Sequence, residues 1–159
     1  MSTTERRART ATSADADALV ALAGAFYAED GFVTPTGQLR ANLQHLLADG
    51  SAYVRVVPSA EGLSAFAITT TSFGLENGLI AELEDLFVIP DARRQGVAEL
   101  LIDDSAQWAR SRGCSHLEVV VAPNGRNVSQ LLHYYTARQF SAEGRQLLVR
   151  ELAHERGVF

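Results

Sequence analysis

Acidic side chains crowd one short apolar stretch in the middle of the chain, and two arginines follow it. Glu82, Glu84 and Asp85 lie within "LIAELEDLFVIP", and Arg93 and Arg94 come just after that stretch. A carboxylate can take the proton of a nucleophile, so these acidic residues are candidates for a general base. Arginine carries a fork of donors that suits phosphate oxygens. The residue types therefore indicate proton removal beside a bound anion.

The two arginines stand where a predicted strand turns into a predicted helix. Gly96 follows them and opens an amphipathic stretch, 96–112. A helix N-terminus offers unpaired backbone N–H groups and the positive end of the helix dipole, which together can bind a phosphate. A glycine there lets the backbone approach the ligand without an intervening Cβ. The alternative is a surface arginine pair beside a glycine that caps a helix.

Length and composition indicate one ordinary globular domain that spans residues 1–159. The chain is 47% hydrophobic and 21% charged, and no apolar run approaches the ~20 residues of a membrane span. The first nineteen residues contain arginines but no apolar segment after them, unlike a secretory signal. We therefore expect a cytosolic protein with no membrane partner.

Charge and cysteine usage exclude several kinds of site. The net charge is −5 and no basic stripe appears, which argues against a nucleic-acid partner. The single cysteine and four scattered histidines show no metal-ligand spacing, so we expect no metal. The sequence contains no lysine, which rules out a Schiff-base lysine and the Gly-Lys-Ser/Thr phosphate loop.

Hydrophobic periodicity predicts the elements that position these residues. Apolar residues at helical spacing predict two helices near the N-terminus, one running from Ser13 to Tyr27 and one around 39–47. Three β-rich segments then follow between turn signals and predict an antiparallel meander. The remaining expected elements are a first strand at 6–11, helices at 96–112 and 127–138, a short strand at 116–122 and a closing strand at 145–152.

The arginine-glycine stretch, with its flanking strand and helix, resembles a known loop. Arg-x-x-Gly-x-Ala at 93–98 is similar to the acetyl-CoA pyrophosphate loop of the GNAT N-acetyltransferase superfamily, whose pattern is Gln/Arg-x-x-Gly-x-Gly/Ala. The expected order of elements matches too, and the resemblance covers essentially the whole chain, most strongly from Glu82 to Phe140. Within the superfamily, "LEDLFVIPDARRQG", "HLEVVVA" and "YYTARQF" look most like the spermidine/spermine acetyltransferase branch.

The resemblance implies a fold and a co-substrate. The fold is α/β (α+β): a mixed, mostly antiparallel central sheet of six or seven strands, splayed between strands four and five, with helices on both faces. Acetyl-CoA would place its diphosphate on the N–H groups of 95–98 and pair its pantetheine arm with the main chain of 86–88. The implied cofactor contacts are Leu86, Phe87, Val88, Arg93, Arg94, Gln95, Gly96, Val97, Ala98, Asn127 and Tyr134.

Two carboxylates compete for the role of general base. Glu84 aligns with the base proposed for the spermidine/spermine branch, whereas Glu82 stands where histone-type members of the superfamily place theirs. Residues 82 and 84 share a face of a regular strand, but a bulge is common at this point in the family. We favour Glu84, and a solvated acidic stretch on the sheet rim is the alternative.

Two neighbouring tyrosines compete for the role of general acid. Family members often use a tyrosine five residues before the aromatic of a Gly-Phe pair, and counting back from Phe140 gives Tyr135. Gln139 stands in place of that glycine. An asparagine seven residues before the tyrosine usually contacts pantetheine, and counting forward from Asn127 gives Tyr134. We favour Tyr135, which could instead be a core aromatic.

The acceptor site in this fold is usually shaped by the first two helices and the loop between them. Here that region carries Tyr27, Glu29 and Asp30, which with Glu82 and Asp85 could line an acidic groove for a cationic amine. A polyamine-like or aminoglycoside-like acceptor fits, as does a peptide amine. Alternatively, Glu29 and Asp30 merely end a helix.

Two functions remain open at this point. The resemblance favours an N-acetyltransferase that moves an acetyl group directly to a primary amine. A non-catalytic acetyl-CoA-binding module needs only the loop, and a protein or peptide amine acetyltransferase needs a different acceptor. We also expect a homodimer, because exposed edges of a splayed sheet invite pairing and the superfamily is often dimeric.

Overall fold

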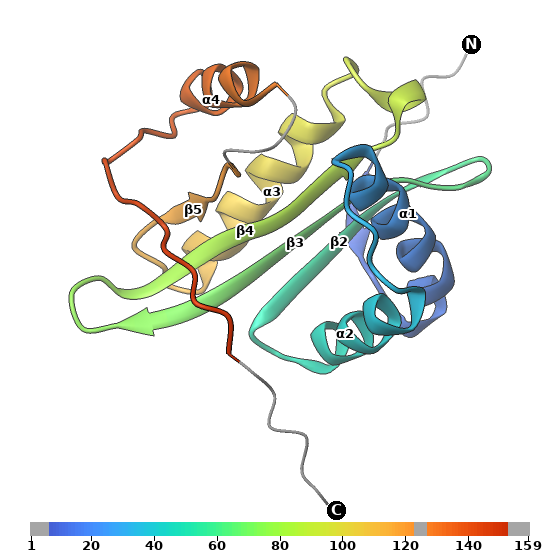
Figure 1. Ribbon diagram of the computed structural model, residues 1–159, viewed down its shortest axis with the longest axis horizontal. Coiled ribbons are helices and arrows are strands. Elements are labelled where there is room, and N and C mark those ends of the chain that lie inside the picture. Colours follow the sequence, from blue (N-terminus) through green and yellow to red (C-terminus); the bar gives the residue numbers. More distant parts are fainter. Residues whose placement is uncertain (1–6, 123–126, 153–159) are drawn as a thin grey trace, which may run out of the picture.

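One five-stranded sheet organises the protein in this computed structural model, which describes residues 7–122 and 127–152 (Figure 1). The strand order follows the chain, β1-β2-β3-β4-β5. The first four strands pair antiparallel and β5 pairs parallel to β4, so the predicted meander is confirmed. The strands are β1 (Arg9–Thr10), β2 (Ala52–Ser59), β3 (Gly62–Gly74), β4 (Gly78–Val88) and β5 (Leu117–Val119).

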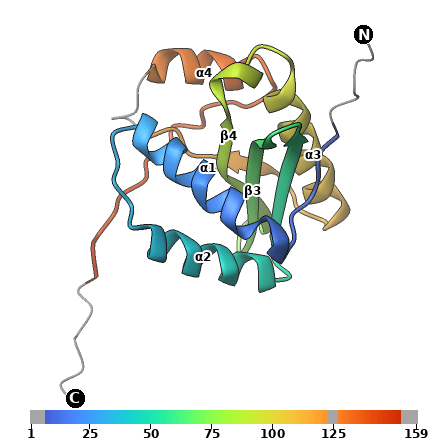
Figure 2. The same ribbon diagram turned by 90° about the vertical axis from the view of Figure 1, so that its right-hand side faces the viewer.

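Helices cover both faces of this sheet, as expected (Figure 2). Helices α1 (Ala16–Glu29) and α2 (Thr36–Ala48) pack on one face, over a core that includes Phe66 and Phe87. Helix α3 (Val97–Ser111) packs on the other face, and α4 (Val128–Thr136) lies near the start of α3. Short 3-10 turns at Ser13–Asp15 and Pro90–Ala92 precede α1 and the α3 loop. Among the described residues, no helix combines the length and apolar character needed to cross a bilayer.

Asp15 fixes the entry of the chain into α1. Its carboxylate accepts hydrogen bonds from both terminal nitrogens of Arg9, at 2.7 and 2.8 Å, and from the Thr12 N–H at 2.9 Å. These donors favour the charged form, so the Arg9 bonds above all lower the pKa of Asp15 to about 2. The charge-assisted bonds join β1 to the first turn beneath α1.

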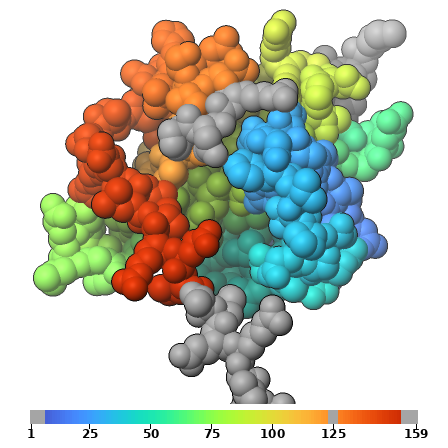
Figure 3. All heavy atoms as spheres, viewed as in Figure 1, coloured from blue at the N-terminus to red at the C-terminus, as the bar shows by residue number. Residues whose placement is uncertain are grey.

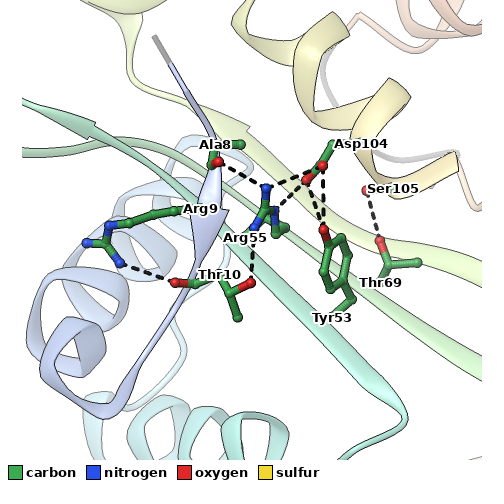
Figure 4. Close-up of polar contacts among 8 residues, drawn as sticks. All are labelled: Ala8, Arg9, Thr10, Tyr53, Arg55, Thr69, Asp104 and Ser105. Atoms are coloured by element: carbon green, nitrogen blue, oxygen red, sulfur yellow. Dashed lines mark hydrogen bonds and ion pairs between the residues drawn. The ribbon is translucent and has the colours of Figure 1, made fainter. Parts of the chain in front are cut away.

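Arg55 joins the first two strands to α3 on the opposite face (Figure 4). Its guanidinium donates to the Ala8 carbonyl at 3.0 Å, to Thr10 Oγ1 at 3.0 Å and to the Asp104 carboxylate of α3. Thr69 donates to Ser105 at 3.0 Å, which adds a buried link between β3 and the same helix. These bonds fix α3, and with it the loop at its N-terminus, relative to the sheet.

Strand β4 carries a bulge at Glu84 and outruns its neighbour β5. Leu83 lies opposite Thr69 and Asp85 lies opposite Ile68, so Glu84 is an extra residue in the ladder. Pairing with β5 ends at Leu83, although β4 continues to Val88. The expected divergence of the fourth and fifth strands therefore begins at the bulge.

The predicted strand count was wrong. We expected six or seven strands, including a closing strand at 145–152, but the described residues contain five, and 145–152 form no regular structure. The residue types of this segment are typical of a strand, but a strand also needs hydrogen-bond partners for its main-chain groups. The segment instead runs across the sheet face that also carries α1 and α2 (Figure 1), where Arg145 lies 4.0 Å from Glu118. Leu147, Leu148 and Val149 remain exposed.

Candidate active site

Beyond the bulge, β4 presents an open main-chain edge. The Ile89 N–H donates to the Ser64 carbonyl of β3 at 2.9 Å. Main-chain groups alternate in direction along an antiparallel strand, so those of Leu86 and Val88 point away from β3. No strand pairs with them there, because β5 has already ended. This edge can hydrogen-bond an extended ligand without any particular side chain.

The loop after β4 turns sharply into the start of α3. Arg94 and Gly96 both have a positive φ, of 59° and 75°. The first residues of α3, from Val97 onward, have N–H groups with no helical partner, because the intrahelical ladder begins with Leu100 bonding to Gly96. A Cβ at Gly96 would meet no protein atom within 4 Å. The helix end therefore opens onto free space, as a phosphate site requires.

The two arginines of the loop differ in their surroundings. Arg93 Nε donates to the Val88 carbonyl at 2.9 Å, and its Nη2 donates to Glu29 at 2.8 Å. Arg94 is exposed, and its guanidinium contacts no acidic or polar partner within the described chain. Next to it, Gln95 bonds the Asp91 carbonyl at 3.1 Å, which closes the turn.

The three carboxylates of β4 lie together on the sheet face that carries α1 and α2. Glu84 accepts a hydrogen bond from Thr70 at 2.8 Å and is otherwise exposed. Burial, followed by the nearby charge of Glu84, raises the pKa of Glu82. Burial also raises the pKa of Asp85, with Glu84 adding to the effect and a bond from Tyr27 opposing it. The site is therefore acidic and partly dehydrated.

Tyr27 links α1 to this group. Its hydroxyl donates to Asp85 at 2.8 Å, and burial, followed by the charge of Asp85, raises its pKa. Both residues line a cavity of about 180 Å³ between α1, α2 and the sheet, whose walls are mostly apolar and include Phe66 and Asn42. The predicted acceptor residues Tyr27 and Asp85 are thus in direct contact.

Glu118 of β5 extends the acidic face and His116 lies just before that strand, and the sequence analysis assigned neither residue to the site. Glu118 lies opposite Glu82 in the parallel pairing, and its charge contributes to the raised pKa of Glu82. His116 Nε2 lies 3.1 Å from Glu118, and its Nδ1 lies 2.9 Å from Ser115. The alternation of side chains along a strand predicts that Glu118 and His116 share a face. The sequence does not give the register between β4 and β5, which places Glu118 opposite Glu82.

The two candidate tyrosines lie on α4, on the α3 side of the sheet. Tyr135 is the more buried, packs edge-to-face on Phe140 at 5.4 Å, and has a pKa raised to about 12 by burial. Its hydroxyl forms no hydrogen bond within the described chain. Tyr134 lies under the Arg138 guanidinium, 3.6 Å from the ring centre. Asn127 is the N-cap residue of α4, with a φ of 59°, and its side chain forms no capping hydrogen bond within the described chain.

The predicted residues thus form two groups on either side of β4. The carboxylates, Tyr27 and the end of α1 with Glu29 and Asp30 lie on one side, and the α4 tyrosines lie on the other. In the space-filling view, β3 and β4 lie deeper than α1, α2 and the segment 141–152 that flank them (Figure 3). Across residues 7–122 and 127–152, no His, Cys, Asp or Glu side chains gather as a metal site would require.

Known proteins resemble this chain in sequence and in fold. Residues 21–137 match the model of the acetyltransferase (GNAT) family. A stretch of 64 residues is 38% identical to an aminoglycoside N(6')-acetyltransferase type 1 of Klebsiella aerogenes, covering 39% of this chain and 42% of that protein. The relative is not a spermidine/spermine enzyme, so the comparison supports the superfamily and not that branch.

Solved structures share the fold over nearly the whole chain. An integron cassette protein from the mobile metagenome of Cole Harbour Salt Marsh is 26% identical, with a TM-score of 0.79 over 92% of this chain and 91% of its own. The aminoglycoside N-acetyltransferase AAC(6')-Iy in complex with CoA is 20% identical, with a TM-score of 0.77 over 94% and 96%. At that identity the second likeness concerns the fold alone.

Proposed function

The chain belongs to the acetyltransferase (GNAT) family, and we propose that it is an acetyl-CoA-dependent N-acetyltransferase for a small cationic amine. The acceptor is aminoglycoside-like or polyamine-like, with a primary amine that receives the acetyl group directly. One observation carries the proposal. The open edge of β4 begins at Glu84, where carboxylates also gather on the α1 side.

The described loop and edge fit acetyl-CoA. The N–H groups of Gln95, Gly96, Val97 and Ala98 would hold the diphosphate, and the exposed Arg94 would add a fork of donors. Main-chain groups of Leu86 and Val88, on either side of Phe87, would hold the pantetheine arm, with Asn127 and Tyr134 beside it. When bound, acetyl-CoA supplies an acetyl group that is activated as a thioester.

Glu84 is our candidate for the general base. An alkylamine is mostly protonated near neutral pH and must lose a proton before it can act as a nucleophile. Glu84 is the bulge residue where the open edge begins, and Thr70 orients its carboxylate at 2.8 Å. Glu82 remains the alternative, because burial raises its pKa and so strengthens it as a base.

Tyr135 is our candidate for the acid that protonates the departing thiolate. Its ring is held by Phe140 and its hydroxyl has no partner in the part of the chain that is described. A pKa raised to about 12 by burial keeps the phenol protonated at neutral pH, so its proton is present when the thiolate departs. Tyr134 is engaged with Arg138, which makes it the second choice.

The acceptor would lie on the acidic face between α1, α2 and β4. Asp85 and Tyr27 form the inner part of this face, with Glu82 further along β4 and Glu29 and Asp30 at the end of α1. Glu29 is paired with Arg93, so Asp30, Glu82 and Asp85 are the carboxylates that would attract a polycation and hold one of its ammonium groups while another reacts. A peptide amine is the second candidate acceptor. The carboxylates of the described face favour a small polycation over a peptide.

A panel of amines assayed for release of free CoA tests the proposal. Aminoglycosides and polyamines should release CoA in an amount that depends on acceptor concentration, and a neutral amine or peptide should release less. If acetyl-CoA raises the melting temperature but no amine releases CoA, the protein is a binding module and not an enzyme.

We also propose a homodimer. The unpaired segment 145–152 exposes Leu147, Leu148, Val149 and Leu152, and burying these side chains against a second copy would remove them from water. Light scattering should then give twice the chain mass of 17.2 kDa. A mass near that of one chain at micromolar concentration would contradict the dimer.

A further inference from the structure

We propose that Arg93 positions the acceptor side of the site, while Arg94 is the arginine of the pair that reaches the diphosphate. The proposal rests on the function proposed above and divides two adjacent arginines of one loop between two substrates. It concerns the end of α1, which carries Tyr27 and Glu29 and flanks the acidic face.

Every contact of the Arg93 guanidinium points toward β4 and α1. It forms an ion pair of 2.8 Å with Glu29 in the last turn of α1 and lies 5.6 Å from the ring centre of Phe87. Its Nε donates to the Val88 carbonyl at 2.9 Å. This carbonyl lies on the open edge of β4, so Arg93 occupies one of the edge's acceptors and leaves the N–H of Val88 for a ligand.

The contacts continue from Arg93 to the acceptor face. Phe87 packs on Phe26 of α1, with ring centres 5.3 Å apart, and Phe26 packs on Tyr27 at 5.1 Å. Tyr27 in turn donates to Asp85 at 2.8 Å. The C-terminal end of α1 is thus held against β4 by Tyr27 at Asp85 and by Phe26 at Phe87. The Arg93–Glu29 pair joins the last turn of α1 to the loop after β4.

Arg94 has the surroundings that a diphosphate ligand requires. Its positive φ of 59° turns the chain between Arg93 and the helix start, and its side chain is exposed with no acidic partner in the described ranges. Arg93 could reach a phosphate only by leaving both Glu29 and the Val88 carbonyl. Losing Arg93 should therefore loosen the α1 end, whereas losing Arg94 should weaken the anion site.

Four variants test this division: Arg93→Gln, Glu29→Gln, the double variant, and Arg94→Gln as the matched neighbour. Acceptor KM and kcat are measured at saturating acetyl-CoA, and the acetyl-CoA Kd by calorimetry. Arg93→Gln and Glu29→Gln should each raise the acceptor KM roughly tenfold with a smaller change in kcat, because the acceptor is misplaced. The double variant should lose less than the sum of the two single variants, because both substitutions break the same Arg93–Glu29 pair.

The Kd of acetyl-CoA separates the two arginines. It should change by less than about twofold in Arg93→Gln and rise roughly tenfold in Arg94→Gln, which loses a charge-assisted contact. Arg93→Lys, which keeps the charge opposite Glu29, should restore part of the acceptor KM. A merely structural role would lower the melting temperature of both Arg93 variants without this split between KM and kcat.

Three results would overturn the assignment. They are a loss of acetyl-CoA affinity in Arg93→Gln equal to that in Arg94→Gln, additive effects of Arg93→Gln and Glu29→Gln, or a lower acceptor KM once Arg93 is removed. If the wild-type protein turns over no amine, the proposed enzyme fails. The acetyl-CoA titration of the two arginine variants still decides which arginine binds the diphosphate.

Discussion

Replacing Gly96 with alanine should separate the cost of folding from the cost of binding. Gly96 has a φ of 75°, and a Cβ there would contact no protein atom within 4 Å. The stability cost is therefore that of placing an L-residue in the left-handed region, about 1–2 kcal/mol. For a chain of this length that lowers the melting temperature by roughly 2–8 °C.

The binding cost should come in addition, because the new methyl group would project into the space proposed for the diphosphate. Losing one charge-assisted hydrogen bond costs about 1.5–3 kcal/mol, or roughly 10- to 150-fold in Kd. Calorimetric titration with acetyl-CoA measures this loss directly, at a temperature well below the melting point of the variant.

Gly113 provides the matched control at the other end of the same helix. It has a φ of 81°, and a Cβ would again meet nothing within 4 Å. Gly113→Ala should cost a similar amount of stability, since only the backbone conformation opposes it, and leave the Kd for acetyl-CoA unchanged. Equal loss of affinity in the two variants, or none in Gly96→Ala, would refute the phosphate loop.

Three further predictions follow from the site and the core. Glu84→Gln should lower kcat roughly 10²–10⁴-fold, or about 3–5 kcal/mol of barrier, and this loss should shrink as the pH approaches the pKa of the amine. Rates measured between about pH 6 and 10 test this. A larger loss in Glu82→Gln would make Glu82 the base instead. Tyr135→Phe should slow steady-state turnover more than Tyr134→Phe, because only the former loses the proposed acid. The lowered pKa of Asp15 stabilises the folded protein at neutral pH, and this stabilisation disappears as the pH falls from 3.8 to about 2. In urea titrations, Asp15→Asn should therefore be less stable than wild type by about 1–2 kcal/mol at pH 7 and equally stable in acid.

Local sequence patterns were sufficient to predict the elements around the site. The β-rich segments, the helix that begins after Gly96 and the helix that carries Tyr135 depend on periodicity and on turn residues a few positions apart, and each is confirmed. The prediction of a closing strand at 145–152 was wrong. A strand must pair with the free edge of a sheet, and this segment instead crosses the face of the sheet.

The directions of individual side chains could not be predicted in the same way. The bulge at Glu84 was expected only from the family, and the pairing of Glu82 with Glu118 depends on the register between two strands. Arg93 and Arg94 are identical in type and adjacent in sequence. Only the tertiary position of Glu29 at the end of α1 distinguishes them.

The fate of the acetyl carbon tests the central claim most directly. Acetyl-CoA labelled in the acetyl group is incubated with the protein and an aminoglycoside or polyamine, and the label is located by mass spectrometry. We predict label on a nitrogen of the amine, in an amount equal to the free CoA released. Label found only in free acetate, or left on acetyl-CoA that the protein binds but does not consume, would contradict the account.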